Sequence, residues 1–302
     1  MNDLATDLAV ELSGVSKKYR YFTLEDIHLQ LPRGQIMGLI GANGAGKSTT
    51  IRILMGLVHQ DSGEVRVLGH SMPAEQVAAK WDIGFASEDM RLYDSMTLDW
   101  HMSFMRSIYP NWDHAYAQLL LKRFGLRVDQ KIKGISHGQR VKAALLLVLA
   151  RKPQLLVLDE PTTGLDPVAR HEILRELTNV MADEGRSVLF SSHNTQDVEQ
   201  ISDQITFIDR GRILDSMDKE TYLDRWRRLR LEIPLGIELP PLPGIVGVQR
   251  QGRLAVATSN AFVPDLAHAY ENTGVHVQSI ENMTLEEIFV ANVEHSREEV
   301  EA

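Results

Sequence analysis

Four short apolar runs constrain the fold of this 302-residue chain more than any other feature. The runs are QIMGLI, LLVLDEP, SVLFSSH and QITFID. Strands that are buried on both faces of a parallel sheet have such nearly continuous apolar sequences. The stretches between the runs have helical character, and this alternation predicts an α/β fold, with helices on the faces of a parallel sheet.

Two further patterns predict additional structure in the same part of the chain. Apolar and polar residues alternate from Leu8 to Leu12 and from Ile27 to Leu31, which is typical of half-exposed antiparallel strands. Between about residues 90 and 138, Thr97 and Asn111 each precede a stretch with helical spacing and are its expected N-cap. We therefore expect an antiparallel β subdomain and a helical insertion.

The last part of the chain has its own pattern of short elements. LRLEIP, GIVGVQR, RLAVATS and VHVQSIE have the spacing of strands, and PDLAHAYENTG and TLEEIFVANV have that of helices. We predict a first domain over residues 1–217 and a small α+β domain over residues 218–302.

Composition and charge limit the class of protein. The chain has no cysteine, so a disulfide framework is excluded. The longest apolar run, Ala143–Ala150, is too short to span a bilayer, and the first residues do not have the pattern of a secretory signal. We expect a soluble, cytoplasmic chain. The net charge of −9 disfavours broad binding to nucleic acid, so no nucleic-acid partner is expected.

The segment GANGAGKST carries the most specific motif of the chain. It matches the phosphate-loop pattern, follows an apolar run and precedes a helical stretch, which is the context that the motif requires. Its glycines let backbone N–H groups face phosphate oxygens, Lys47 can reach the β- and γ-phosphates, and Ser48 can bind Mg²⁺. The residues expected to bind the nucleotide here are Gly41, Asn43, Gly44, Ala45, Gly46, Lys47, Ser48 and Thr49.

Charged side chains follow two of the other apolar runs. Asp159 and Glu160 end one run and His193 ends another, and ligands of parallel sheets bind at the carboxyl ends of the strands. Asp159 suits a contact with Mg²⁺, and Glu160 suits polarising an attacking water. His193 is either a γ-phosphate contact or a surface histidine. Asp166 either contacts the nucleotide or caps the helix that begins at Pro167.

The order of the motifs KKY, GANGAGKST, SED, ISHGQ, LLVLDEP, TGLD and SSH resembles that of ABC transporter nucleotide-binding subunits over about residues 8–215. The resemblance implies a P-loop NTPase fold with an ABC-type ATP-binding domain over residues 1–217. It also implies ATP and Mg²⁺ as cofactors and ATP hydrolysis as the activity, with Lys47, Glu160 and His193 as catalytic residues.

The resemblance further implies that two copies of the chain pack head to tail around two ATP molecules. Ser136, Gly138 and Gln139 of ISHGQ would then face the triphosphate that the partner holds. Tyr19 matches the aromatic residue that stacks on adenine, and Tyr21 and Phe22 are alternatives.

Two positions depart from the family pattern. His137 replaces a glycine of the usual LSGGQ, which limits the backbone and adds a titratable group. Glu88 stands where the family usually has a glutamine that contacts Mg²⁺, and Asp89 is a register alternative. A carboxylate adds negative charge beside the phosphates. We expect activity to be retained, with Ser48, Glu88 and Asp159 as the metal ligands.

The resemblance predicts a homodimeric ATPase that powers export by an integral membrane subunit on a separate chain, at the cytoplasmic face of the membrane. TLEEIF is similar to a closing helix of exporter-type members. The alternative is a soluble ABC-type ATPase that acts on nucleic acid, ribosomes or protein.

The role of residues 218–302 stays open. The arginines of DRWRRLRL form either a solvated charged face or a contact with acidic lipid headgroups or a partner. These are Arg225, Arg227, Arg228 and Arg230.

Overall fold

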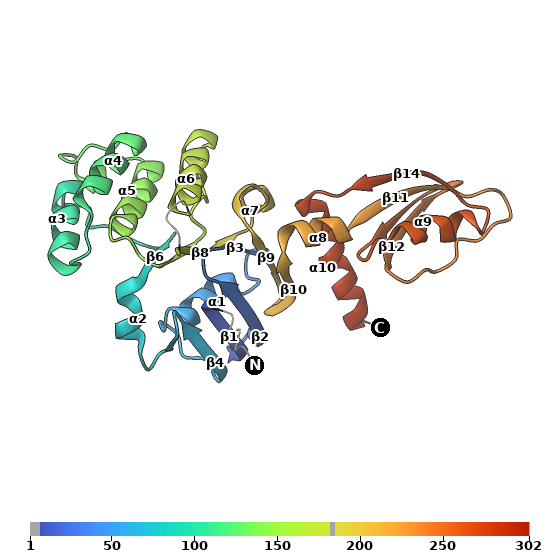
Figure 1. The fold of residues 1–302 in the computed structure, drawn as a ribbon, viewed down its shortest axis with the longest axis horizontal. Coiled ribbons are helices and arrows are strands. Elements are labelled where there is room, and N and C mark those ends of the chain that lie inside the picture. The colour runs from blue at the N-terminus through green and yellow to red at the C-terminus, as the bar shows by residue number, and fades with distance from the viewer. Residues whose placement is uncertain (1–6, 182–184, 302) are drawn as a thin grey trace. The chain divides into compact units, whose positions relative to one another are not determined.

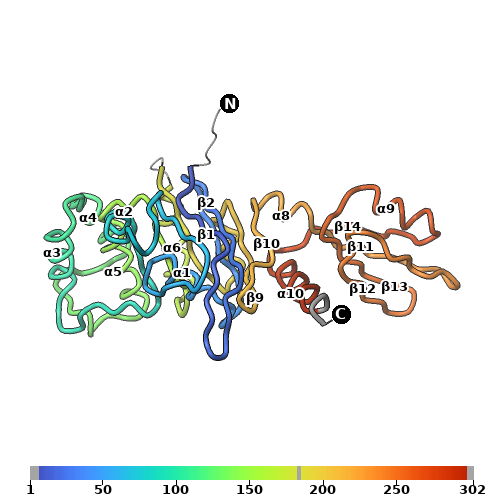
Figure 2. Tube along the Cα trace, turned by 90° about the horizontal axis from the view of Figure 1, so that it is seen from below, coloured from blue at the N-terminus to red at the C-terminus, as the bar shows by residue number. Residues whose placement is uncertain are grey.

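The computed structural model describes residues 7–181 and 185–301, and their side chains as far as residue 297. The chain divides into two compact units, Met1–Ile213 and Leu214–Ala302, each with its own apolar core (Figures 1 and 2). Among the described residues, no helix is both long enough and apolar enough to cross a membrane.

The first unit contains five strands of a six-stranded sheet, and the sixth strand, β10 (Arg212–Asp218), begins in it and runs past Ile213. In sheet order the strands are β10, β9 (Gln204–Asp209), β3 (Ile36–Ile40), β8 (Ser187–Ser192), β7 (Leu155–Asp159) and β6 (Ile83–Ser87). β3 pairs in parallel with β8 and β9, and β7 pairs in parallel with β6 and β8. Every residue of β3, β7 and β8 is buried, which explains their apolar sequences. The predicted α/β fold is confirmed.

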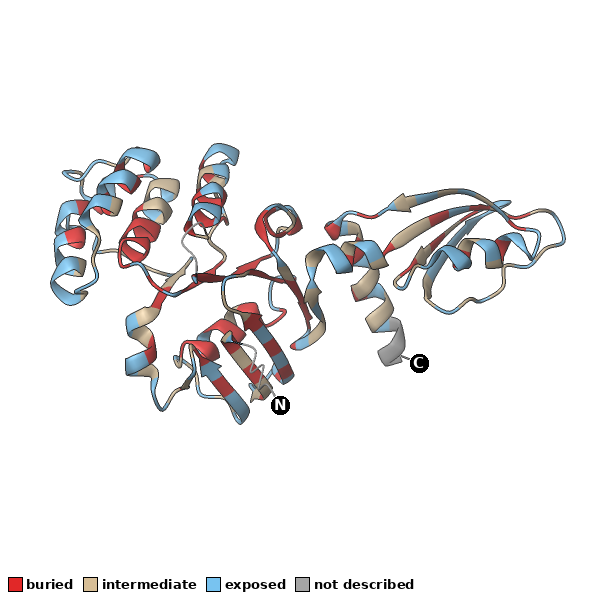
Figure 3. Cartoon of the chain, viewed as in Figure 1, coloured by how far each residue is buried: buried red, intermediate tan, exposed pale blue. Residues whose placement is uncertain are grey.

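An antiparallel sheet completes the core of this unit. In sheet order its strands are β2 (Thr23–Pro32), β1 (Leu8–Lys18), β4 (Ser62–Val67) and β5 (His70–Ser71). Burial alternates along β2, as the period of its sequence predicts. Its apolar side chains share one cluster with those of β3 and β7, and Figure 3 shows the buried segments in red. Members of this cluster are Val10, Leu12, Ile27, Leu29, Leu31, Met37, Leu39, Leu155 and Val157.

Helices surround the two sheets. They are α1 (Lys47–Leu54), α2 (Gln76–Asp82), α3 (Leu98–Ile108), α4 (His114–Phe124), the 3₁₀ turn η1 (Ile132–Gly134), α5 (His137–Leu149), α6 (Pro167–Val180) and α7 (Thr195–Ile201). α3 and α4 both pack against α5, as Figure 1 shows, and with η1 they form the expected helical insertion.

Of the two helix caps predicted from the sequence, that of α3 is confirmed and that of α4 is not. Thr97 caps α3 as predicted, because its Oγ1 accepts a hydrogen bond from the Trp100 N–H. The predicted cap of α4 is wrong. Asp113 and not Asn111 caps this helix, and its Oδ1 accepts from the Tyr116 N–H at 2.8 Å. The backbone at Asn111 is still in the turn that ends α3, so the helix begins later than expected.

The second unit is an antiparallel sheet with three helices. In sheet order its strands are β12 (Ile245–Gln251), β13 (Leu254–Ser259), β11 (Arg227–Glu232) and β14 (His276–Asn282). Its helices are α8 (Lys219–Arg225), α9 (Pro264–Glu271) and α10 (Leu285–Glu301). Leu229, Leu231, Ala257, Leu266 and Tyr270 contribute to its buried cluster. The four strands and two of the helices lie where the sequence predicts them, whereas α8 was not anticipated.

The arginines of DRWRRLRL all have acidic neighbours within the second unit. Arg228 pairs with Glu287 at 2.9 Å and Arg230 pairs with Glu281 at 2.6 Å. Arg225 and Arg227 likewise face acidic side chains, those of Asp215 and Asp224 respectively. These ion pairs within the unit leave less free positive charge for acidic lipids.

Candidate functional site

The parallel sheet brings the predicted site residues to one edge. Ile40 at the end of β3 is paired with Ser192 of β8, and Asp159 at the end of β7 is paired with Ser191. The carboxyl ends of these strands are therefore level, and the segments that follow them meet at the edge where parallel sheets bind ligands.

The phosphate loop connects β3 to α1 with a backbone that requires glycine. Gly44 and Gly46 have φ angles of 81° and 119°, which are in the region that favours glycine. A Cβ atom on Gly41 would lie only 2.4 Å from the backbone oxygen of Ile208. Lys47, the first residue of α1, is 5% exposed, and its Nζ donates to Gly41 O at 2.6 Å and to Ala42 O at 3.2 Å.

Glu160 lies against this lysine. Lys47 Nζ and Glu160 Oε1 are 3.0 Å apart, and the Glu160 side chain is 11% exposed. The other carboxylate oxygen, Oε2, accepts hydrogen bonds from Thr163 Oγ1 at 2.9 Å and from His193 Nδ1 at 2.8 Å. Among the described side chains, Lys47 is the only partner of Oε1. Glu160 also has a positive φ of 54°, an uncommon conformation for a residue with a side chain.

The environment keeps the Glu160 carboxyl ionised. Burial alone would raise its pKa, because a charged group loses solvation when it is buried. The positive charge of Lys47 and the hydrogen bonds from Thr163 and His193 outweigh burial, and the pKa lies below its ordinary value. The carboxylate is therefore available as a proton acceptor at neutral pH.

Asp159 and two serines form a small cluster of oxygen atoms beside the lysine. Asp159 Oδ1 accepts hydrogen bonds from Ser48 Oγ at 3.1 Å and from Ser191 Oγ at 2.7 Å. Ser191 Oγ in turn accepts from the backbone N–H of Glu160 at 3.0 Å. Hydroxyl and carboxylate oxygens are the ligands that Mg²⁺ prefers, and Mg²⁺ keeps several waters and takes phosphate oxygens for the rest. The donor set fits a magnesium ion held by Ser48 and Asp159.

The turn before α5 is built as a strong helix start. Ser136 and Gln139 form a reciprocal capping box: the Gln139 N–H donates to Ser136 Oγ, and the Ser136 N–H donates to Gln139 Oε1. Capping boxes satisfy two backbone donors that a helix start leaves unpaired. Among the described residues, Ser136 and Gln139 are held by each other and not by the phosphate loop of their own chain. Gly138 follows in the first turn of α5.

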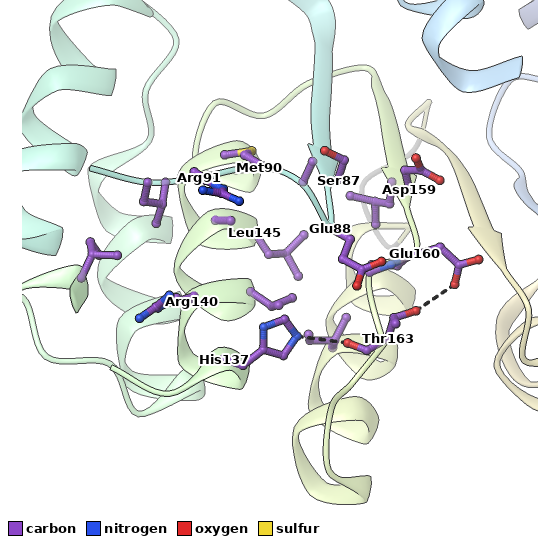
Figure 4. A pocket seen from close by; sticks show the side chains of 18 of the residues that line it. Ser87, Glu88, Met90, Arg91, His137, Arg140, Leu145, Asp159, Glu160 and Thr163 are labelled. Carbon is purple, nitrogen blue, oxygen red and sulfur yellow. Dashed lines mark hydrogen bonds between the residues drawn. The ribbon is translucent and has the colours of Figure 1, made fainter. Parts of the chain in front are cut away.

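Glu88 and its neighbours line a cavity of about 320 Å³ between the end of β7 and the start of α5. Figure 4 shows the side chains of Glu88, Arg91, His137 and Glu160 around it. The Glu88 N–H donates to the backbone oxygen of Asp159 at 3.1 Å. Asp89, the register alternative, points elsewhere and forms an ion pair with Arg52 at 3.0 Å.

The aromatic candidates for an adenine contact lie in the turn between β1 and β2. Tyr19 is 42% exposed, and its ring centroid lies 6.4 Å from that of Phe22. Tyr21 is 85% exposed, with the guanidinium group of Arg20 4.9 Å from its ring centroid. Lys17 Nζ lies 5.9 Å from the ring centroid of Tyr19, and among the described contacts no hydrogen bond fixes the direction of either tyrosine ring.

Asp166 acts as a helix cap in this structure. Its Oδ1 accepts hydrogen bonds from the backbone N–H groups of Val168 and Ala169 at the start of α6. Because the Ala169 and Val168 N–H groups stabilise the charged form, the pKa of Asp166 lies below its ordinary value. The capping interpretation of Asp166 therefore accounts for its observed contacts.

Two residues of the site were not predicted from the sequence. Ser191 connects Asp159 to the backbone of Glu160, and Thr163 donates to the Glu160 carboxylate. Ser191 lies in the buried strand SVLFSS, where its hydroxyl needs a partner, and that was the available signal. Thr163 had no comparable signal, because its contact depends on how the chain turns after Glu160.

Comparisons with known proteins agree on one family. The family model described as "ABC transporter" matches residues 24–163. The linearmycin resistance ATP-binding protein LnrL of Bacillus subtilis is 34% identical, over 68% of this chain and 68% of its own length. The Nod factor export ATP-binding protein I of Ralstonia nicotianae is 33% identical, over 67% of this chain and 65% of its own. A solved ATP-binding subunit of an ABC transporter superposes with a TM-score of 0.65 at 27% identity, over 72% of this chain and 92% of its own.

Proposed function

This chain belongs to the ABC transporter family as one of its ATP-binding, ATP-hydrolysing proteins, and from that premise we propose that it powers export by a separate membrane subunit. The observation that supports the proposal most is the meeting of Lys47, Asp159 and Glu160 at one edge of the parallel sheet. A phosphate loop, an oxygen cluster and a general base are the parts that a phosphoryl-transfer site needs.

Each group has a separate role in hydrolysis. Lys47 holds the β- and γ-phosphates, and the loop N–H groups from Gly41 to Thr49 bind the remaining phosphate oxygens. Ser48 and Asp159 would hold Mg²⁺, with Glu88 as a further contact, and the ion would neutralise charge that develops on the transferring phosphoryl group. Glu160 Oε1, which lies 3.0 Å from Lys47 Nζ, orients and deprotonates the attacking water once Lys47 turns to the phosphates. His193, which Glu160 orients through Nδ1, contacts the γ-phosphate.

We place two nucleotides between two copies of the chain. The capped start of α5 offers backbone N–H groups and the positive end of a helix dipole, which suit an anion. The phosphate-binding lysine lies at the start of a different helix, α1. A head-to-tail dimer lets the turn at Ser136, Gly138 and Gln139 bind the triphosphate that the partner's phosphate loop holds. Tyr19 stacks on the adenine in this arrangement.

A groove beside the helical insertion is the surface for the membrane subunit. Its volume is about 360 Å³, and its walls come from α3, α5, β6 and the segment after Glu88. Phe104, which lines it, is 44% exposed, and the ring of Trp100 stacks on that of Phe104. Partly exposed aromatic rings are enriched at protein interfaces. The relatives named for Nod factor export and linearmycin resistance support export as the direction, with the chain at the cytoplasmic face of the membrane.

A mixing experiment tests the shared sites directly. Ser136→Arg blocks the helix-start surface but leaves the phosphate loop intact, and Lys47→Met does the reverse. Each variant alone should lack ATPase activity. In a mixed dimer, one site combines the intact phosphate loop of the first chain with the intact α5 turn of the second, so mixing should restore part of the activity.

Controls separate misfolding from loss of the site. Ser136→Arg chains should still bind a fluorescent ATP analogue, because Lys47 is unchanged, whereas Lys47→Met chains should bind it weakly. If the two inactive variants fold and no activity returns at any mixing ratio, the proposal of shared sites is refuted.

A further inference from the structure

His137 connects the turn before α5 to the loop that carries Glu160. Its imidazole Nε2–H donates to the backbone oxygen of Thr163 at 3.1 Å, across 26 positions of sequence. Figure 4 shows this hydrogen bond as a dashed line beside the one from Thr163 to Glu160. A glycine at position 137, as in the usual LSGGQ, has no side chain that could form the bond.

The two hydrogen bonds meet in a single residue. Thr163 accepts from His137 through its backbone oxygen and donates through Oγ1 to Glu160 Oε2 at 2.9 Å. The next residue, Gly164, has a φ of 71°, and a Cβ atom there would lie 3.4 Å from His137 Nε2. The ring therefore lies directly over a turn whose backbone needs glycine, and the position of the imidazole restrains the loop from Glu160 to Gly164.

We propose that His137 is a positioning residue that couples the two ATP sites of the dimer. This inference rests on the proposed function, because it needs Ser136 to face a phosphate held by the partner. Ser136 and His137 are adjacent, so movement of the α5 turn on a bound triphosphate changes the bond from His137 to Thr163. Thr163 in turn sets the direction of Glu160, which serves the nucleotide on the chain's own Lys47.

The consequence is that ATP bound at one site of the dimer changes the orientation of Glu160 at the other site. This effect depends on two hydrogen bonds and one short turn, all within a single chain. Loss of the His137 bond should leave the phosphate loop intact, because His137 has no described contact with Gly41–Thr49. It should make Glu160 less well oriented and the two sites less dependent on each other.

Three substitutions at position 137 separate positioning from a structural effect. His137→Gln keeps an N–H donor of similar reach, His137→Leu keeps bulk without a donor, and His137→Gly restores the usual residue of the motif. We expect His137→Gln to stay near wild type. We expect the other two to lower kcat about twofold to tenfold, the range that one net hydrogen bond supports, with KM for ATP nearly unchanged. The Hill coefficient for ATP should fall towards one.

A double-mutant cycle with Thr163→Val decides whether the effect passes through Thr163. His137→Leu combined with Thr163→Val should be no slower than Thr163→Val alone, since both changes break the same path. If the losses of kcat from His137→Leu and Thr163→Val multiply in the double variant, the proposal is overturned. It is also overturned if His137→Gln loses as much activity as His137→Leu. Failure of the mixing experiment above, with the cycle still non-additive, would refute the shared sites but not the link from His137 to Glu160.

Discussion

Replacing Glu160 with glutamine isolates the role of one negative charge. The amide has nearly the same shape as the carboxylate, so Thr163 and His193 keep a neighbour of the same size, but it cannot take a proton from water. General-base catalysis contributes about 10²–10⁴-fold to a rate, or about 3–5 kcal/mol of the barrier. We therefore expect kcat for ATP to fall by about 10²–10⁴-fold in Glu160→Gln.

The same change should strengthen ATP binding. Lys47 Nζ lies 3.0 Å from Glu160 Oε1, and a triphosphate must compete with this carboxylate for the lysine. At an effective dielectric constant of about 20, the gross attraction at that distance is about 5 kcal/mol, and desolvation cancels most of it. If about 1.5 kcal/mol remains, as for a hydrogen bond to a charged group, removing the charge tightens ATP binding by about tenfold.

The assays are turnover by phosphate release, ATP affinity by titration calorimetry, and mass by light scattering with and without Mg-ATP. Glu160→Gln should form a stable dimer with ATP but not with ADP, whereas Glu160→Asp serves as a control that keeps the charge. Wild-type turnover by Glu160→Gln would refute the assignment of Glu160 as the base. Loss of turnover with weaker ATP binding would refute the argument about competition for Lys47.

Three further predictions follow from individual contacts. The pKa of Glu160 lies below its unfolded value of about 4.3, so its contribution to stability is present above that pH and is lost as the pH falls below it. Between about pH 5 and 3, the free energy of unfolding of Glu160→Gln, measured by chemical unfolding, should therefore decline less than that of wild type. Ser191→Ala removes a donor to Asp159 Oδ1 and should raise the Mg²⁺ concentration for half-maximal ATPase activity by about tenfold, measured by Mg²⁺ titration. Asp113→Ala should lower the free energy of unfolding by about 1 kcal/mol through loss of the α4 cap, whereas Asn111→Ala should leave it within about 0.5 kcal/mol.

The parts of the fold that the sequence predicted are those with a strong local signal. The runs that form β3, β7 and β8 are apolar because both faces of each strand are buried. Their composition therefore predicts a central position in the sheet. The phosphate loop was equally clear, since Gly44 and Gly46 adopt φ angles that few other residues tolerate. The position of Asp159 and Glu160 at the end of an apolar run then predicted that they lie at the ligand-binding edge of the sheet.

The parts that were not predicted depend on contacts between distant segments. Asn111 and Asp113 are both good capping residues, and the sequence could not show that the chain is still turning at Asn111. The hydrogen bond from His137 to Thr163 joins residues 26 positions apart, and the sequence around either residue does not predict it. The ion pairs of Arg228 and Arg230 likewise require the pairing of β11 with β14, or the return of α10.

In the proposed mechanism, Lys47 links the binding of ATP to the release of the base Glu160. An ammonium group has three N–H donors, and Lys47 Nζ already faces three oxygens, those of Gly41, Ala42 and the Glu160 carboxylate. It can reach two phosphates only by leaving at least one of them, and the carboxylate is the partner whose charge a phosphate replaces. In the proposed mechanism, binding of the triphosphate would therefore free Glu160 Oε1 for the attacking water, while Thr163 and His193 keep the other oxygen in place. On this proposal, the ion pair with Lys47 restrains Glu160 until the phosphates of ATP replace the carboxylate as the partner of Lys47.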